Sequence, residues 1–128
     1  MSDREHARTL LAIGRRDLKA LRGMSDSTIF DDEVFGFHAQ QAVEKALKSW
    51  LSLLGVRYPR IHDLEELSAT LESSGADAER RVTGLLGLTD FAVQMRYEAG
   101  AADGESLDRS EILHAIEALL EHVESLVG

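Results

Sequence analysis

The feature that most constrains this chain is an apolar repeat over residues 31–54, which keeps helical spacing for about five turns. It predicts one long amphipathic helix, with Asp31, Asp32 and Glu33 at its start, where the helix dipole favours anions. Gly55 follows as a natural stop. The positions expected in the core are Phe35, Ala39, Ala42, Val43, Ala46, Leu47, Trp50, Leu51 and Leu54.

Four more segments show the same period, at residues 3–22, 62–73, 78–97 and 108–127. The sequence therefore predicts an all-α fold, an up-and-down bundle of four long helices plus one short helix. With 128 residues, close to the commonest domain size, we expect one domain over 1–128. The third of these segments contains Gly84 and Gly87, which weaken a helix by up to ~1 kcal/mol each and predict a close helix crossing. The expected core positions are Ala7, Leu10, Leu11, Gly14, Leu18, Leu21, Leu64, Leu67, Leu71, Val82, Leu85, Leu86, Thr89, Ala92, Val93, Ile112, Ala115, Ile116, Leu119, Val123, Leu126 and Val127.

Composition narrows the function classes. The chain has no cysteine, which excludes disulfides and thiolate metal sites and fits a reducing compartment. No apolar run approaches the ~20 residues of a membrane span, and no signal peptide is visible, so we expect a cytoplasmic protein with no membrane contact. The net charge of −9 argues against broad electrostatic binding to nucleic acid. Residues 1–22 nevertheless carry six basic and three acidic side chains, so a polyanion would approach there or at a local pocket.

Most familiar chemical motifs are absent. There is no glycine-rich phosphate loop and no HExxH zinc motif. Only Glu111 and His114 have the Glu-x-x-His spacing of di-iron bundles, which need two such pairs. We therefore expect neither a metal site nor a cofactor.

The most informative stretch is FHAQQAVEKALK at residues 37–48, in which His38, Gln41, Lys45 and Lys48 form a polar stripe beside the apolar one. This stretch resembles a helix of the HEPN family (higher eukaryotes and prokaryotes nucleotide-binding domain). The resemblance spans nearly the whole chain. It extends to a following glycine, a His-x-Leu helix start and a late Arg-Tyr pair, which are here Gly55, His62 with Leu64, and Arg96 with Tyr97.

The resemblance implies a helical bundle that usually forms a homodimer. Such domains are often encoded beside, or fused to, a small nucleotidyltransferase in toxin–antitoxin or related modules. Many are metal-independent ribonucleases that use an Arg-x4-6-His motif at the dimer cleft. An arginine and a histidine there can orient the scissile phosphate and take the 2′-hydroxyl proton.

This chain departs from that motif. By resemblance the equivalent arginine is Arg96, but the histidine is missing, since residues 101–103 are two alanines and an aspartate. The spacing also occurs in Arg57/His62 and in Arg109/His114, and matches by chance are expected with so many arginines. Arg57 and His62 flank Pro59 at a helix entrance, where free backbone N–H groups favour anions. His62 could equally be a helix-start residue that bonds locally.

Three functional hypotheses follow. The first is a homodimeric partner of a nucleotidyltransferase that binds a nucleotide or RNA in a pocket lined by His38, Gln41, Lys45, Arg96 and Tyr97. The second is a ribonuclease toxin with Arg57 and His62 as catalytic residues. The third is a helical interaction protein without a ligand, in which the polar stripe satisfies buried groups while Glu44 and Lys48 pair on the surface.

Overall fold

All regular structure in the described part of the chain is helical, which confirms the all-α prediction. The computed structural model describes residues 2–58, 60–92 and 107–128. No helix within these ranges is both long and apolar enough to cross a membrane. The elements are α1 (Asp3–Gly23), α2 (Asp32–Leu53), α3 (Leu64–Ser73), α4 (Glu79–Val82), the 3-10 helix η1 (Leu86–Phe91) and α5 (Arg109–Val127).

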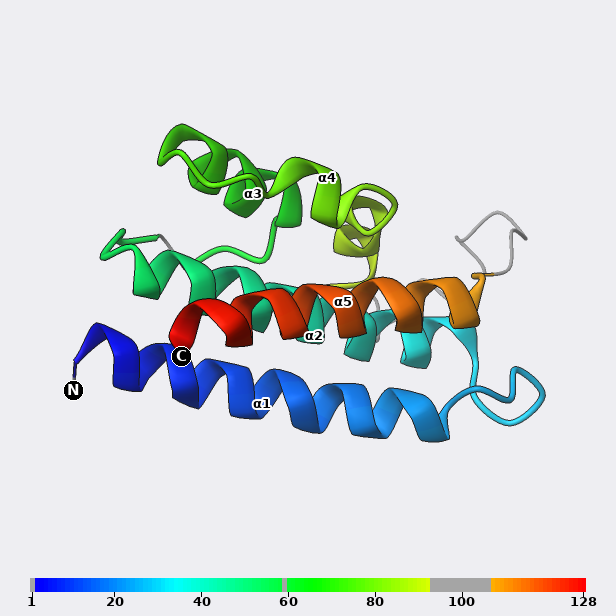
Figure 1. Cartoon of the computed structure of the whole chain (residues 1–128). Coiled ribbons are helices and arrows are strands. Elements are labelled where there is room, and N and C mark those ends of the chain that lie inside the picture. Colours follow the sequence, from blue (N-terminus) through cyan, green and yellow to red (C-terminus); the bar gives the residue numbers. More distant parts are fainter. Residues whose placement is uncertain (1, 59, 93–106) are drawn as a thin grey trace.

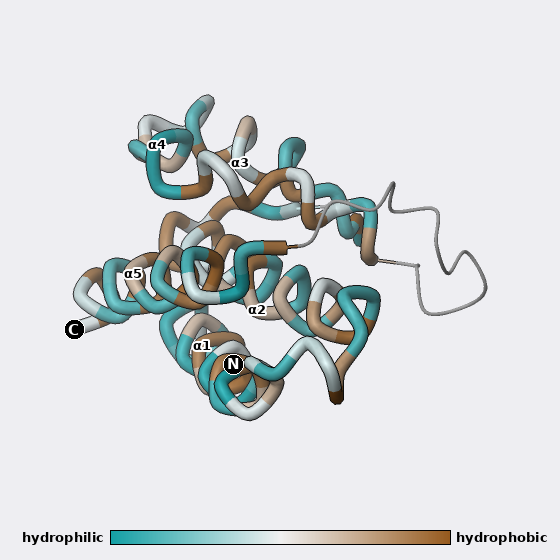
Figure 2. The backbone as a smooth tube through the Cα atoms, turned by 90° about the vertical axis from the view of Figure 1, so that its right-hand side faces the viewer, coloured by the Kyte–Doolittle hydropathy of each residue, from teal (hydrophilic) through white to brown (hydrophobic). Residues whose placement is uncertain are grey.

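The three long helices α1, α2 and α5 pack side by side (Figure 1). α3 and α4 lie on the side of α2 that faces away from α1, as the view along the bundle also shows (Figure 2). Both chain ends lie at the same end of the bundle, where the Arg4 guanidinium donates a hydrogen bond to the carbonyl of Val127. α2 is thus the central element, with a helix layer on each side.

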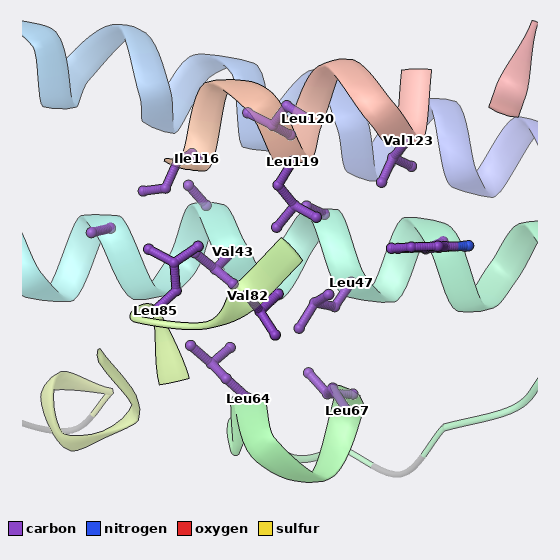
Figure 3. Packing of buried hydrophobic residues seen from close by; sticks show 14 of the residues in the cluster. Val43, Leu47, Leu64, Leu67, Val82, Leu85, Ile116, Leu119, Leu120 and Val123 are labelled. Atoms are coloured by element: carbon purple, nitrogen blue, oxygen red, sulfur yellow. The ribbon is translucent and has the colours of Figure 1, made fainter. Parts of the chain in front are cut away.

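The core is continuous across α2. Val43 and Leu47 of α2 lie between Leu119 of α5 on one side and Leu64 of α3 and Val82 of α4 on the other (Figure 3). All six positions predicted to be buried in α1 are buried. Leu54 and Leu126 were expected in the core, but they are 46% and 45% exposed: Leu54 follows the last residue of α2, and Leu126 lies in the last turn of α5, where the neighbouring Val127 is the buried residue.

The continuous helix expected over 78–97 is wrong for residues 78–92. α4 ends after Val82, because Thr83 is extended (φ −56°, ψ 127°) and Gly84 has φ +90°, a conformation that glycine adopts without strain. The chain then turns into η1. The described ranges therefore contain three long helices, the ten-residue α3 and two short helical pieces instead of four long helices and one short one. Residues 93–97 lie outside the described residues.

The close contacts between helices occur at Gly14 and Gly36 and not at the expected Gly84 and Gly87. No described atom lies within 4 Å of a Cβ placed at Gly84 or Gly87. A Cβ at Gly14 of α1 would lie 3.1 Å from a side-chain atom of α5, and one at Gly36 of α2 would lie 2.5 Å from the Phe91 ring. Gly36 needs a residue without a side chain, since a Cβ closer than about 3 Å forces a neighbour to move, whereas a Cβ at Gly14 would make a tight contact with the Leu120 side chain.

Candidate functional site

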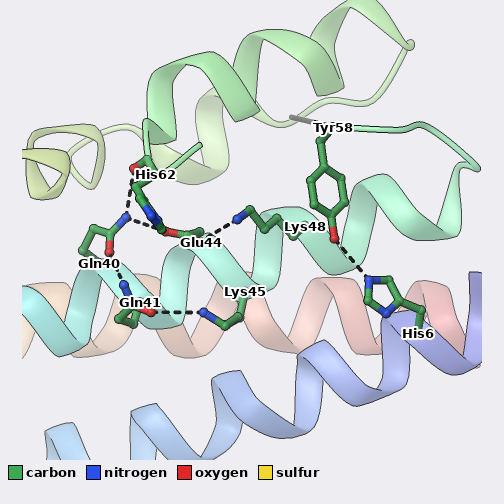
Figure 4. Close-up of polar contacts among 8 residues, drawn as sticks. All are labelled: His6, Gln40, Gln41, Glu44, Lys45, Lys48, Tyr58 and His62. Atoms are coloured by element: carbon green, nitrogen blue, oxygen red, sulfur yellow. Dashed lines mark hydrogen bonds and ion pairs between the residues drawn. The ribbon is translucent and has the colours of Figure 1, made fainter. Parts of the chain in front are cut away.

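A buried amide and a buried carboxylate lie one turn apart on the central helix. Gln40 is fully buried and Glu44 is 2% exposed, on the side of α2 that faces the segment before α3. Figure 4 shows both within a row of polar side chains along this helix. This polar row consists of Gln40, Gln41, Glu44, Lys45 and Lys48 together with His62, which contacts Glu44. The expected pairing of Glu44 with Lys48 is present at 2.7 Å, but it is not the surface pair that the sequence suggested. Burying an ionised carboxylate is costly, so its partners decide whether it is tolerated.

Both oxygens of Glu44 are used. Oε1 accepts from Gln40 Nε2 at 2.9 Å and contacts His62 Nδ1 at 2.9 Å, while Oε2 accepts from Lys48 Nζ. Burial by itself raises the pKa of Glu44, but the hydrogen bonds from Lys48, His62 and Gln40 outweigh it and hold that pKa below its ordinary value. Glu44 is therefore an anion at neutral pH.

This anion fixes how the His62 ring is protonated. An ionised carboxylate only accepts hydrogen bonds, so Nδ1 of His62 must carry a proton. In the neutral ring Nε2 is then left with a free lone pair. The side chain is 59% exposed, and Nε2 has no hydrogen bond to any described residue. Gln40 Nε2 also donates to the His62 carbonyl at 2.9 Å, so ring and backbone are both held.

The network continues along α2 to two of the predicted binding residues. Gln41 Nε2 donates to Gln40 Oε1 at 2.9 Å, and Lys45 Nζ donates to Gln41 Oε1 at 3.1 Å. The structure thus connects Gln41, Lys45 and His62 through two buried residues that were not predicted as site residues.

His38 lies beside this network rather than in it. Its ring packs edge-on against Phe37, with the centroids 5.4 Å apart. Asp17 of α1 is close enough to His38 to interact with it electrostatically. Burial raises the pKa of Asp17, and the nearby cationic groups of Lys45, His38 and Arg16 oppose this only in part.

Arg57 lies in the segment that follows the end of α2. Together with His6 and Tyr58 it lines an open pocket of about 500 Å³, to which His62 does not contribute. His6 Nε2 and the Tyr58 hydroxyl are hydrogen-bonded at 3.2 Å, and Lys48 Nζ lies 5.5 Å from the centroid of the Tyr58 ring. The described contacts do not bring Arg57 and His62 together. Arg96 and Tyr97 lie outside the described residues.

The profile of the HEPN domain matches residues 7–126, almost the whole chain. The chain belongs to the HEPN domain family. No curated protein and no solved structure matches it. Membership of the family indicates a function related to nucleotides or RNA, or an activity of the ribonuclease kind.

The second Arg-x4-His pair, Arg109 and His114, has a structural explanation in this HEPN domain. Arg109 is 7% exposed and donates to the carbonyls of Met24 and Phe30, both at 2.6 Å, and to Asp32 Oδ1 at 2.8 Å. It ties the loop between α1 and α2 to the start of α5. These hydrogen bonds give the Arg109 guanidinium a structural role, whereas the side chain of His114 is exposed.

Gln40 and Glu44 are the residues that sequence reasoning missed in this HEPN domain. Their spacing did carry a signal, because Gln40 stands three and seven residues before the core residues Val43 and Leu47, and Glu44 stands one turn after Gln40. A polar pair at core spacing predicts buried groups that must find partners. The partner, His62, is 18 residues further along the chain and could not be assigned from spacing.

Proposed function

We propose that this HEPN domain binds RNA or a nucleotide through phosphate contacts at the polar row on α2. We propose further that it acts in the cytoplasm as a homodimer, and that it is the regulatory partner of a small nucleotidyltransferase in a toxin–antitoxin-type module. The observation that carries the binding proposal is the His62 ring, exposed at its Nε2 edge and held at its Nδ1 edge by buried Glu44. Lys45 of α2 supplies a positive charge in the same hydrogen-bond network, whereas the charge of Lys48 is paired with Glu44.

The burial of Glu44 supports a recognition role for His62. A buried carboxylate and amide add little to stability compared with apolar side chains of the same size. They are well suited, however, to hold an exposed ring in one orientation, and binding sites need such supporting contacts behind the groups that touch the ligand. Because the chain carries a net charge of −9, contact with a polyanion has to be local, and the row offers Lys45, whose hydrogen-bond partner is the uncharged Gln41.

One observation favours a second candidate, metal-independent ribonuclease activity through Arg57 and His62. The free lone pair on Nε2 is what a general base needs to take the proton of a ribose 2′-hydroxyl. In that reading Glu44 keeps the ring in the tautomer that accepts the proton. The absence of a contact between Arg57 and His62 favours the binding proposal over this one.

The test compares RNA binding and RNA cleavage in the same samples without metal ions. Fluorescence anisotropy with a short single-stranded RNA measures affinity, and a denaturing gel measures cleavage. We expect His62→Ala to bind about tenfold more weakly, a loss of ~1.4 kcal/mol. The matched control is His114→Ala, which removes an exposed histidine of α5.

The outcomes separate the three hypotheses. RNA binding without cleavage, weakened in His62→Ala alone, supports the binding module. Cleavage by the parent that is lost in both Arg57→Ala and His62→Ala supports the ribonuclease. Equal RNA affinity of the parent and His62→Ala refutes a role of the polar row in binding. If the parent binds no RNA at all, the third hypothesis, a helical interaction protein without a ligand, is supported.

The proposed partners need their own measurement. Sedimentation of the parent chain tests the homodimer, and co-purification with a nucleotidyltransferase encoded beside it tests the partner. A monomer that captures no such enzyme contradicts both parts of that proposal.

A further inference from the structure

A second polar site lies where α1 begins and α2 ends. Its pocket of about 500 Å³ is lined by Asp3 and His6 of α1 and by residues 52 and 55–58, which include Arg57 and Tyr58. Volumes of about 300–1,000 Å³ are usual for small-molecule sites. Val56 is the only aliphatic side chain in this lining, so the pocket suits a polar ligand.

The pocket follows from how the two helices end. α2 stops at Leu53, and Gly55 with φ +71° turns the chain back, so that residues 56–58 pass the start of α1. A Cβ on Gly55 would lie 3.6 Å from Asp3 Oδ2, which shows how close the two helix ends are. The amino-terminal end of the 21-residue α1 adds the positive end of a helix dipole.

The lining combines three kinds of hydrogen-bonding group. The guanidinium of Arg57 is exposed and has no ion pair or hydrogen bond with any described residue, and it suits an anion with several oxygens. The Asp3 carboxylate is a pure acceptor, which suits hydroxyl groups. The rings of His6 and Tyr58 are held together by their hydrogen bond and form a fixed polar wall.

We propose that this pocket binds a phosphomonoester carried on a hydroxylated body, such as a 5-phosphorylated ribose. Arg57 binds the phosphate, and Asp3 accepts hydrogen bonds from the hydroxyl groups. A free carboxylate ligand also suits arginine, but it leaves Asp3 without hydroxyl donors. The site is distinct from the one around His62, which lines no part of the pocket. The proposal therefore stands or falls independently of RNA binding at the row.

The test is an NMR titration of the labelled protein with ribose 5-phosphate, ribose, inorganic phosphate and glutamate as separate probes. We expect ribose 5-phosphate to bind most tightly and to shift the signals of His6 and Tyr58 rather than those of His62. Arg57→Ala should weaken binding at least tenfold, because a charge-assisted contact is lost. Asp3→Asn should weaken ribose 5-phosphate binding but not phosphate binding. Arg60→Ala is the matched control, since Arg60 is exposed on the same segment but does not line the pocket.

Three results would overturn the proposal. They are no binding of ribose 5-phosphate at millimolar concentrations, equal affinity of the parent and Arg57→Ala, and tighter binding of glutamate than of ribose 5-phosphate. Loss of RNA binding in His62→Ala with intact ribose 5-phosphate binding would leave the pocket in place and confirm that the two sites are separate.

Discussion

The two sides of α2 are built in different ways. On one side α1 and α5 complete a bundle of long, regular helices. On the other side residues 64–91, here named the cap, consist of the ten-residue α3, the single-turn α4 and η1. Long helices bury a continuous stripe of side chains, so many apolar contacts hold each of them together. Short pieces depend on a few specific contacts, so we expect the cap to open at lower free energy than the bundle.

The contacts that hold the cap are few and specific. The Phe91 ring packs onto α2 where Gly36 has no side chain, and the Leu64 N–H donates to Thr89 Oγ1 at 3.0 Å. At the entrance to the cap, Glu44 and Gln40 hold His62. Each of these contacts can be altered by a single substitution, and the effect of that substitution tests whether the cap depends on the contact.

The largest effect should come from Glu44→Gln. The change leaves Lys48, which is 13% exposed, without its anion and weakens the hold on His62. Removing one partner of a buried ion pair costs about 3–5 kcal/mol, and we expect the lower end because Lys48 can reach solvent. Denaturant unfolding measures the total loss, and amide exchange should show it first in the cap.

The loss of stability caused by Glu44→Gln should depend on pH in a definite direction. Because the pKa of Glu44 is lowered in the folded state, its stabilisation is complete above the ordinary value of 4.5 and is lost as pH falls through the lowered value. The difference between parent and Glu44→Gln should therefore shrink in acid. Glu121→Gln, an exposed change on α5, is the matched control for the loss of one carboxylate. A difference that stays constant from neutral pH into acid would contradict the ionised state of Glu44.

A smaller effect is expected from Gly36→Ala. The new methyl group would lie 2.5 Å from the Phe91 ring, and overpacking of this kind costs about 1–3 kcal/mol. Alanine regains up to ~1 kcal/mol of helix propensity, so the net loss should be roughly 1–2 kcal/mol. Amide exchange in η1 should speed up while α1 and α5 keep their protection. Adding Phe91→Leu should restore part of the loss.

Gly23→Ala is the matched control for that change. Gly23 ends α1 with a negative φ, and no described atom lies within 4 Å of a Cβ placed there. Its substitution should leave stability unchanged or raise it slightly. If Gly36→Ala behaves like this control, the Phe91 contact does not hold the cap.

The same contrast explains how much of the fold was predictable. The stripes of α1, α2, α3 and α5 follow from local spacing, and their bounds came out within about two residues. The break after Val82 was missed because residues 78–92 also carry apolar residues at helical spacing, and the glycines were read as a crossing. Gly84 instead takes a positive φ, which lets Val82 before it and Leu85 after it both enter the core.

The candidate site, like the fold, was predictable from the sequence only in part. Gln41, Lys45 and His62 were named from sequence, and the structure links them. The link itself runs through Gln40 and Glu44, which look like ordinary helix residues until the segment before α3 covers them. Contacts between residues far apart in sequence depend on tertiary structure, so spacing could not show that Arg57 and His62 lie in separate surroundings.

The smallest effect should come from the bundle, where ion pairs join α1 to α5. Glu117 bonds Arg15 at 2.9 Å and also pairs with Arg22, but it is 29% exposed and Arg15 keeps Glu124 as a second partner. Glu117→Gln should therefore cost less than ~1 kcal/mol, and the cost should fall as salt is added, since exposed charges are screened. Unfolding at low and high salt measures it. A loss as large as that of Glu44→Gln would mean that α5 is held by its surface charges rather than by its apolar stripe, and the distinction between bundle and cap would fail.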